Sequence, residues 1–378
     1  MTKRKFSAAV LACFLVTSFL CACSARFGNG GTADRKEPAA ETEEKLTVVG
    51  FSQVGAESDW RSANTESMKS VFTAANGYEL IFDDAQQKQT NQIMAIRSFI
   101  QQEVDYIVLA PVTETGWDTV LQEAHDAGIP VIIVDRMVDV PNSNLFECWV
   151  GSDFELEARK MCEWLRWFCV KHNISAEDVY IADIQGTIGA SAQIGRTRGL
   201  KIAAEEYGWN IVAEVEGEFT RTKGYEATQQ LLLRYPKLNV VYCENDNEAF
   251  GAIEAIEDAG LRVGSDITAG EIMVLSFDGV KPEALQDVLD DSISCIAECN
   301  PLHGPRVEAI IQKLQNGETP QKYEYVDEDV FSAYDQIESV IVDSKEYPIT
   351  QVSEELIEKR RAEFDAGSYD EELPDNVY

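Results

Sequence analysis

The stretch LTVVGFSQVGAESDWR, at 46–61, decides the fold together with a second stretch, VIIVDR, at 131–136. Each begins with a short apolar run rich in β-branched residues and ends abruptly in polar or aromatic side chains. Such runs are typical of buried strands in a parallel sheet, and the residues after them lie at its carboxyl edge, where open α/β proteins bind ligands. We therefore expect one crevice that receives Ser52, Gln53, Trp60, Arg61, Asp135 and Arg136.

The alternation of apolar runs and helical patterns continues along the chain. In the first half, apolar runs open at Leu46, Tyr78, Tyr106 and Val131, and helical patterns span 60–75, 89–102 and 113–127. Gly77 and Gly128 follow the first and third of these helices, where C-terminal caps favour glycine. This order predicts a parallel sheet with right-handed crossovers.

A second series of the same kind follows. It has helices at 156–170, 193–207, 222–235 and 248–259, and strands at 179–183, 211–215, 240–243 and 273–277. One more strand, 294–298, precedes a helix at 304–315 that we expect to pack back on the first lobe, so that the chain crosses between lobes more than once. The fold class is therefore α/β, with two similar doubly wound parallel-sheet lobes. The acidic end of the chain begins with a helix at 353–364.

The first 23 residues are typical of a targeting segment. Lys3, Arg4 and Lys5 form a basic start, 8–20 is an apolar stretch, and Leu20-Cys21-Ala22-Cys23 resembles the cleavage box of a bacterial lipoprotein. We expect lipidation at Cys23 and an extracytoplasmic protein anchored to the cell membrane. The alternative is an ordinary secretory signal without lipid. Residues 24–45 have the composition of a disordered tether.

Composition excludes several classes of function. The chain has 378 residues and a formal net charge of -34, which argues against binding to nucleic acid. The six cysteines after Cys23 form no CxxC pair, and with three His in the chain we expect buried free thiols and no metal site. Gly189-Ala190-Ser191-Ala192-Gln193 begins like a nucleophile elbow but lacks its second Gly, and neither a P-loop nor GxGxxG is present. We expect no catalysis and no cofactor.

The residues at the predicted strand ends suit a neutral sugar. Aromatic rings pack on the apolar faces of a sugar, carboxylates accept hydrogen bonds from its hydroxyls, Arg donates, and Asn does both. An Asp-Arg pair or a single Phe is more often structural, so this interpretation depends on the convergence of many such residues. They are Trp60, Phe219 and Phe277; Asp84, Asp135, Asp278 and Glu298; Arg61, Arg136 and Arg196; and Asn245.

The chain resembles the type 1 periplasmic binding proteins of the sugar class, over about 46–345, and within them the galactofuranose-binding proteins of ABC transporters. The matching segments are GFSQVGAESDWR (50–61), DDAQQKQTNQI (83–93), RSFIQQEVDYIVLAPV (97–112), GIPVIIVDR (128–136), IQGTIGAS (184–191), GEFTRTKG (217–224), END (244–246) and FDG (277–279). Phe277 and Glu244 depart from the galactofuranose pattern, which leaves the exact sugar open.

The resemblance implies two lobes that close on a monosaccharide, joined by three crossovers. The lobes would comprise 46–152 plus 299–325 and 153–298 plus 326–350, followed by an acidic extension at 351–378. By position it also implies ligand contacts at Ser52, Trp60, Arg61, Asp84, Asp135, Arg136, Ser152, Arg196, Phe219, Asn245, Phe277, Asp278 and Glu298.

The partners implied are a monosaccharide and ABC permease subunits, with the membrane reached through Cys23, and we expect a monomer. An alternative with the same cleft is a sensor module that presents its closed form to a membrane histidine kinase or chemoreceptor. A repressor of related fold is disfavoured, because the residues before the first strand are acidic rather than a basic helix-turn-helix.

Overall fold

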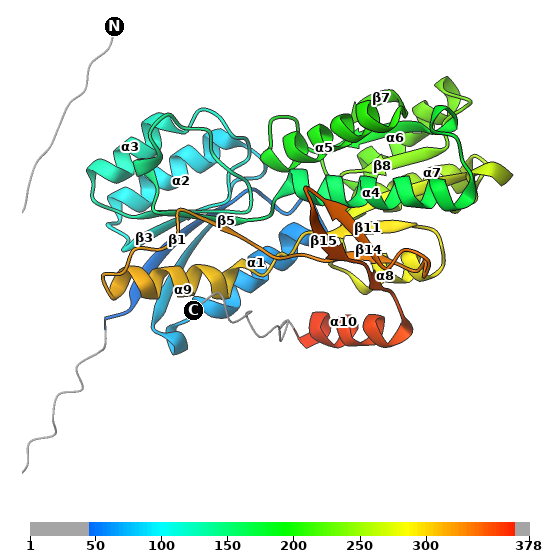
Figure 1. The fold of residues 1–378 in the computed structure, drawn as a ribbon. Coiled ribbons are helices and arrows are strands. Elements are labelled where there is room, and N and C mark those ends of the chain that lie inside the picture. Colours follow the sequence, from blue (N-terminus) through cyan, green and yellow to red (C-terminus); the bar gives the residue numbers. More distant parts are fainter. Residues whose placement is uncertain (1–44, 367–378) are drawn as a thin grey trace, which may run out of the picture. The chain divides into compact units, whose positions relative to one another are not determined.

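The computed structural model describes residues 45–366, which all belong to one compact unit, Glu44–Tyr378 (Figure 1). The expected signal segment with Cys23, the tether up to residue 44 and the last part of the acidic extension, 367–378, lie outside the described residues. Within the described part, no helix has both the length and the apolar character needed to cross a membrane.

The first lobe is built on a six-stranded sheet with the order β12-β5-β4-β3-β1-β2. All of its pairings are parallel. The strands are β1 (Thr47–Gln53), β2 (Tyr78–Asp84), β3 (Tyr106–Leu109), β4 (Val131–Val134), β5 (Cys148–Gly151) and β12 (Tyr323–Tyr325). The helices are α1 (Asp59–Val71), α2 (Gln89–Gln101), α3 (Asp118–Asp126) and α9 (His303–Gln315), with short 3-10 turns η1 (Ala74–Asn76) and η2 (Ser143–Leu145).

Alternating strand residues divide the core of this lobe between the two faces of the sheet. On one face Val49 and Phe51 pack with Met68 of α1 and Ile310 of α9. On the other face the strands pack against α2 and α3. The prediction that the helix near 304–315 returns to the first lobe is therefore confirmed, and Figure 1 shows α9 beside α1.

The second lobe contains the order β16-β13-β11-β10-β8-β6-β7, with β9 paired to β10. The strands are β6 (Tyr180–Gln185), β7 (Asn210–Glu216), β8 (Val240–Cys243), β9 (Arg262–Val263), β10 (Glu271–Asp278), β11 (Cys295–Glu298), β13 (Val330–Ser332) and β16 (Thr350–Gln351). The helices are α4 (Phe154–His172), α5 (Ser191–Tyr207), α6 (Arg221–Arg234), α7 (Asp246–Asp258), α8 (Pro282–Leu289) and α10 (Glu354–Ala366). Two 3-10 turns, η3 (Ala176–Asp178) and η4 (Ile267–Ala269), and a hairpin of β14 (Ser339–Val342) and β15 (Lys345–Pro348) complete it.

The predicted α/β fold with two lobes is confirmed, and most differences lie at element ends and in short elements. The helix predicted from Thr113 begins at Asp118, because residues 113–117 form a turn in which the Trp117 indole donates to the Thr113 carbonyl, 2.6 Å away. The strands β5, β9, β12, β13 and β16, the hairpin and α8 were not predicted. The six cysteines after Cys23 are buried free thiols, as expected.

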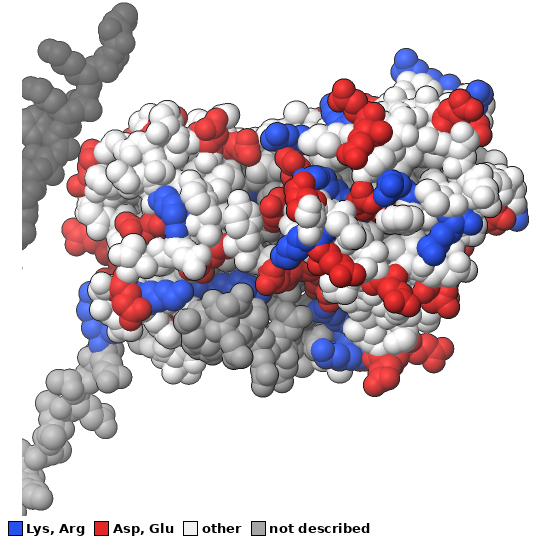
Figure 2. Space-filling view, viewed as in Figure 1, with Lys and Arg blue, Asp and Glu red and all other residues white. Residues whose placement is uncertain are grey.

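Three crossovers connect the lobes, between β5 and α4, between β11 and α9, and between β12 and β13. They bring the carboxyl ends of the strands of both sheets towards one another. On the face shown in Figure 2, acidic side chains are spread over both lobes and mixed with basic ones.

Candidate functional site

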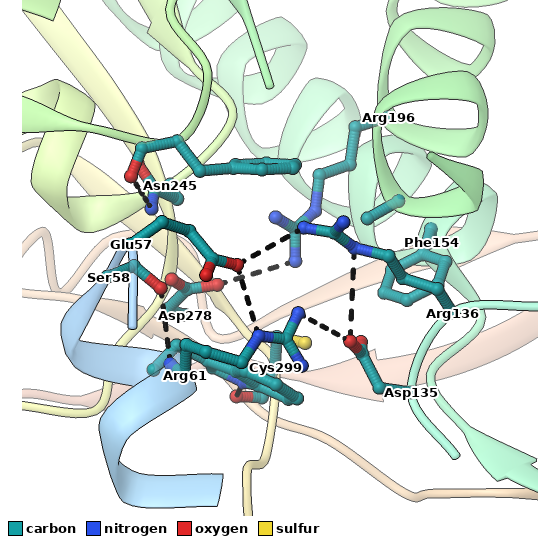
Figure 3. A pocket seen from close by; sticks show the side chains of 13 residues that line it. Glu57, Ser58, Arg61, Asp135, Arg136, Phe154, Arg196, Asn245, Asp278 and Cys299 are labelled. Atoms are coloured by element: carbon teal, nitrogen blue, oxygen red, sulfur yellow. Dashed lines mark hydrogen bonds and ion pairs between the residues drawn. The ribbon is translucent and has the colours of Figure 1, made fainter. Parts of the chain in front are cut away.

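A pocket with an empty volume of about 290 Å³ lies where the carboxyl ends of the two sheets face each other (Figure 3). Its lining residues come from strand ends, helix starts and crossovers of both lobes. They are Glu57, Ser58, Trp60, Arg61, Asp135, Arg136, Phe154, Ala192, Arg196, Phe219, Asn245, Asp278 and Cys299.

The turn after β1 and the start of α1 supply the first wall. Ser58 is the N-cap of α1, and its side chain accepts a hydrogen bond from the Arg61 backbone N–H, 3.1 Å away. The cap fixes where the helix begins, and therefore where Trp60 and Arg61 enter the pocket. The indole N–H of Trp60 donates to the carbonyl of Cys299, 2.7 Å away, so the ring is held against the crossover before α9.

Four charged side chains of the first lobe form one network (Figure 3). Arg61 donates through Nε to Glu57, 3.1 Å away, and its Nη2 forms an ion pair with Asp135 at 2.7 Å. Arg136 lies 3.5 Å from the same Glu57 oxygen and donates to the backbone carbonyl of Val112, 3.0 Å away. Gln53, below the pocket, accepts from Arg61 at 3.2 Å. These contacts fix both guanidiniums through several bonds each.

The same network sets the charge states. Burial opposes ionisation of Asp135, but the guanidiniums of Arg61 and Arg136 outweigh that effect and hold the pKa of the carboxyl below its ordinary value. Burial, with the nearby charge of Arg61, lowers the pKa of Arg136 to about 10. Both side chains are therefore charged at neutral pH, and the first lobe presents fixed donors and acceptors to the pocket.

Arg196 organises the second lobe's side of the pocket. Its Nε donates to Glu157, 2.9 Å away, its Nη1 donates to the carbonyl of Glu244, and its Nη2 lies 3.5 Å from Asp278. The guanidinium also lies over the ring of Phe277, 4.5 Å from the ring centre. Burial raises the pKa of Asp278 to about 7, and Arg196 only partly opposes this effect. Asp278 is thus a carboxyl that titrates near neutrality.

Aromatic rings provide the apolar surfaces of the pocket: Trp60, Phe154 and Phe219. The far end of the Phe219 ring lies against Gly186, where an added Cβ would come within 1.9 Å of the ring. Its backbone N–H donates to Glu248, 2.8 Å away, and its carbonyl accepts from Asn245, 3.1 Å away. The position of this ring is therefore fixed both at its far end and through its backbone.

Three of the lining residues adopt the left-handed backbone region. The φ angles are 62° at Asp135, 59° at Phe219 and 97° at Asp278. Residues other than glycine rarely adopt this region, and such strain is concentrated at functional sites. At Asp278 the strained turn is secured by Asp246, which accepts hydrogen bonds from Ser276 and from the backbone N–H of Gly279.

Two buried oxygens of the pocket residues lack an aligned hydrogen bond within residues 45–366: Oε2 of Glu57 and Oδ2 of Asp135. Buried acceptors of this kind are rare in folded proteins and favour contact with donor groups. Oδ2 of Asp135 is nevertheless held by the ion pair with Arg61 at 2.7 Å, so Oε2 of Glu57 is the acceptor of the pair without a close cation. The pocket thus combines this acceptor with guanidinium donors and aromatic faces. This combination suits a small molecule that carries both hydroxyl groups and apolar surfaces.

One possible group of metal ligands is found among the described residues. An oxygen of Glu157, the sulfur of Cys299 and an oxygen of Glu328 lie within 4.8 Å of one another. Arg196 donates to Glu157, whereas Ser152 and the backbone N–H of Asn300 donate to Glu328. Because both carboxylates already have protein donors, this group carries no metal assignment.

The structure places eight of the thirteen predicted site residues in the pocket lining: Trp60, Arg61, Asp135, Arg136, Arg196, Phe219, Asn245 and Asp278. Two others lie inside the lobes. Ser52 is fully buried in β1, and Phe277 is fully buried in the core, with its ring against Tyr242. Phe277 still supports the pocket indirectly, beneath Arg196.

The other three predicted residues have different partners. Asp84 is exposed at the end of the edge strand β2, where it accepts from the Gln86 backbone N–H. Ser152 donates to Glu328, 2.6 Å away. Glu298 accepts from the Asp329 backbone N–H and forms an ion pair with Arg360 at 3.0 Å. These two contacts are at the crossovers, so Ser152 and Glu298 connect chain segments beside the pocket.

Five lining residues were not predicted: Glu57, Ser58, Phe154, Ala192 and Cys299. Glu57 and Ser58 belong to the opening stretch and lie two to three residues before the predicted Trp60, so the turn itself was the available signal. Phe154 follows the first crossover and Cys299 begins the second. Ala192 lies in the first turn of α5, where a small apolar side chain gives no chemical signal.

Comparisons with known proteins agree with this geometry. Residues 49–296 match a family described as periplasmic binding protein domain. The chain is 39% identical over 280 residues to the galactofuranose-binding protein YtfQ of Escherichia coli (strain K12), covering 73% of this chain and 84% of the relative.

Solved structures show the same likeness. The periplasmic binding protein of the arabinose ABC transporter from Shewanella sp. ANA-3, bound to α- and β-L-arabinofuranose, has a TM-score of 0.73 and 38% identity, covering 85% of this chain and 98% of that one. A protein from Mycobacterium smegmatis in complex with β-D-fucofuranose has a TM-score of 0.71 and 39% identity, covering 76% and 91%. These relatives are described by the sugars that they bind and not by a reaction. The chain therefore belongs to the periplasmic binding protein family, with the type I fold, and is a binding protein rather than an enzyme.

Proposed function

We propose that this protein captures a monosaccharide in its furanose form outside the cytoplasm and delivers it to an ABC permease. The observation that carries the proposal is the pocket itself, in which buried acceptors of Glu57 and Asp135 lie among guanidiniums and aromatic rings. The lining contains three guanidiniums and three carboxyl groups, so its formal charge is balanced, as a neutral ligand requires. The furanose ligands of the two solved relatives support the ring form.

Each lobe would bind part of the sugar. In this proposal, 46–152 with 299–325 and 153–298 with 326–350 move as the two bodies. The sugar has higher affinity for the closed form because only that form brings both sets of contacts together, and it therefore shifts the population towards closure. Trp60 and Phe219 would pack on its apolar faces, while Asp135 and Asp278 would accept from its hydroxyls.

A thermal-shift screen of the purified protein tests the sugar class. The probes are L-arabinose, D-galactose, D-fructose, D-ribose and D-fucose, with phosphate and adenosine as an anion and a nucleoside. A ligand that binds only the folded protein must raise its melting temperature. We expect shifts with one or two of the neutral sugars. A response to phosphate or adenosine, with no response to any sugar, would refute the proposal.

The membrane anchor is a separate part of the proposal, and it rests on the sequence around Cys23 alone. We propose that the mature chain begins at a lipidated Cys23. Metabolic labelling with a radioactive fatty acid should label the wild-type protein and not the Cys23→Ala variant, while Cys21→Ala should still be labelled. Label that persists in Cys23→Ala would refute this assignment.

A further inference from the structure

Beside the pocket, three polar side chains join the two lobes directly. Asp59 is the first residue of α1 in the first lobe, and its carboxylate forms an ion pair with Lys281 of the second lobe at 2.6 Å. Asn247, in the first turn of α7, accepts from the Asp59 backbone N–H at 3.0 Å and donates to the Asp59 side chain at 3.1 Å. One residue of the first lobe thus has two partners in the second.

None of these three residues lines the pocket, although Asp59 lies between the lining residues Ser58 and Trp60. The side chains of Asp59 and Lys281 are 28% and 31% exposed, so water reaches this contact. Other bonds between the lobes include Glu114 N–H to the Gly189 carbonyl at 2.9 Å and Met137 N–H to the Ser191 hydroxyl at 2.8 Å. The ion pair and one of the two Asn247 bonds use the Asp59 side chain, so they can be removed without altering the sugar contacts.

We propose that Asp59, Asn247 and Lys281 form a latch that stabilises the closed form and sets the affinity for the sugar without touching it. The proposal rests on the proposed function, because it requires a ligand that binds the closed form. A contact that exists only in the closed form adds its free energy to closure, and the apparent affinity rises with the population of the competent form. The latch therefore acts mainly on sugar release, since the lobes must separate before the sugar leaves.

The expected size of the effect is modest. A partly exposed ion pair and two side-chain hydrogen bonds each contribute little on their own. We expect Asp59→Ala to weaken sugar affinity about tenfold, which corresponds to about 1.4 kcal/mol. Lys281→Met keeps the Asn247 bonds and should weaken affinity by only about threefold. High salt should lower the sugar affinity of the wild type and leave that of Lys281→Met nearly unchanged, because it screens the ion pair.

The experiment measures affinity by calorimetry and release by stopped-flow tryptophan fluorescence, with L-arabinose and D-galactose as probes. Lys201→Met is the matched control, because Lys201 pairs with Glu214 at 2.7 Å within the second lobe alone. We expect faster release from Asp59→Ala and Lys281→Met, and wild-type release from Lys201→Met. The double variant, Asp59→Ala combined with Lys281→Met, should bind sugar as tightly as Asp59→Ala alone, since the single substitution already removes the ion pair.

Wild-type affinity and release in both Asp59→Ala and Lys281→Met would overturn the latch while leaving sugar binding intact. If the wild type binds neither sugar, single-molecule energy transfer between dyes on the two lobes decides the question without ligand. A lower closed fraction in both latch variants than in Lys201→Met then supports the latch. Identical distance distributions in all variants overturn it.

Discussion

Replacing Asp135 by Asn tests whether the first lobe's charge network stabilises the protein as well as the pocket. Asp135 is 4% exposed, and its carboxylate lies 2.7 Å from Arg61 and 3.9 Å from Arg136. Asn is the matched substitution because it preserves shape and tolerates the left-handed backbone, here with φ 62°. The variant therefore removes the charge while adding little backbone strain.

The magnitude follows from the distance and the burial. Two unit charges 2.7 Å apart attract by about 6 kcal/mol at an effective dielectric constant of about 20. Part of this is offset by desolvation, and breaking one side of a buried pair costs about 3–5 kcal/mol. Asn still accepts a hydrogen bond, so we expect Asp135→Asn to lose about 3 kcal/mol of unfolding free energy at pH 7. Asp135→Ala should lose about 1 kcal/mol more, from backbone strain.

The assay is urea unfolding followed by tryptophan fluorescence, with Glu123→Gln as the control. Glu123 pairs with Arg97 at the same distance, 2.7 Å, but both side chains are well exposed. We expect no measurable change in that variant. The neighbouring guanidiniums lower the pKa of Asp135 in the folded state, so its contribution is present at neutral pH and is lost as the pH falls below about 4. A loss at pH 7 no larger than that of Glu123→Gln would refute the reasoning.

Three other substitutions test the second lobe. Burial raises the pKa of Asp278 to about 7, so its contribution to stability is present at low pH and is lost between about pH 4 and 7. In urea titrations, the unfolding free energy of the wild type should fall by roughly 2–3 kcal/mol relative to that of Asp278→Asn between pH 5 and 7.5. A difference that stays constant with pH would contradict this. Gly186→Ala should displace the Phe219 ring and weaken sugar binding about tenfold in calorimetry, while the circular dichroism spectrum stays unchanged. Wild-type affinity in this variant would show that the position of the ring does not limit sugar affinity. Burial keeps the pKa of Glu248 well above its ordinary value, so Glu248→Gln should melt like the wild type in calorimetric scans. Glu248→Ala also loses the bond from the Phe219 backbone N–H and should lose about 1–3 kcal/mol of unfolding free energy. Equal losses in the two variants would argue against a neutral carboxyl.

The sequence predicted best those side chains that follow the central strands. Asp135 comes directly after β4 and Asp278 ends β10, and both line the pocket, because parallel strands bring their carboxyl ends to one edge. The prediction was less successful within strands. Ser52 and Phe277 are close to strand ends too, but strand residues alternate between faces, and both point into a lobe.

Contacts between distant segments could not be predicted. Glu298 has the right position at the end of β11, yet it pairs with Arg360 of α10, 62 residues later. Ser152 likewise has its partner, Glu328, at another crossover. Glu328 lies between β12 and β13, which were not predicted, whereas Arg360 lies in the predicted last helix, whose packing partner the sequence pattern did not indicate. Which polar residue faces the pocket was thus decided by the nearest compensating charge and not by its position along the strand.

The division of ion pairs between the lobes explains how the pocket can open and still select a neutral ligand. Glu57, Arg61, Asp135 and Arg136 pair with one another in the first lobe. Arg196 pairs with Glu157 and Asp278 in the second lobe. Separation of the lobes therefore breaks none of these pairs, and opening leaves no buried charge without its partner. An anionic ligand would compete with carboxylates already bound to each guanidinium, whereas a neutral polyol can donate to their remaining oxygens. The Asp59–Lys281 pair does span the lobes, and because water reaches it, its loss on opening is small enough for the sugar to decide the balance.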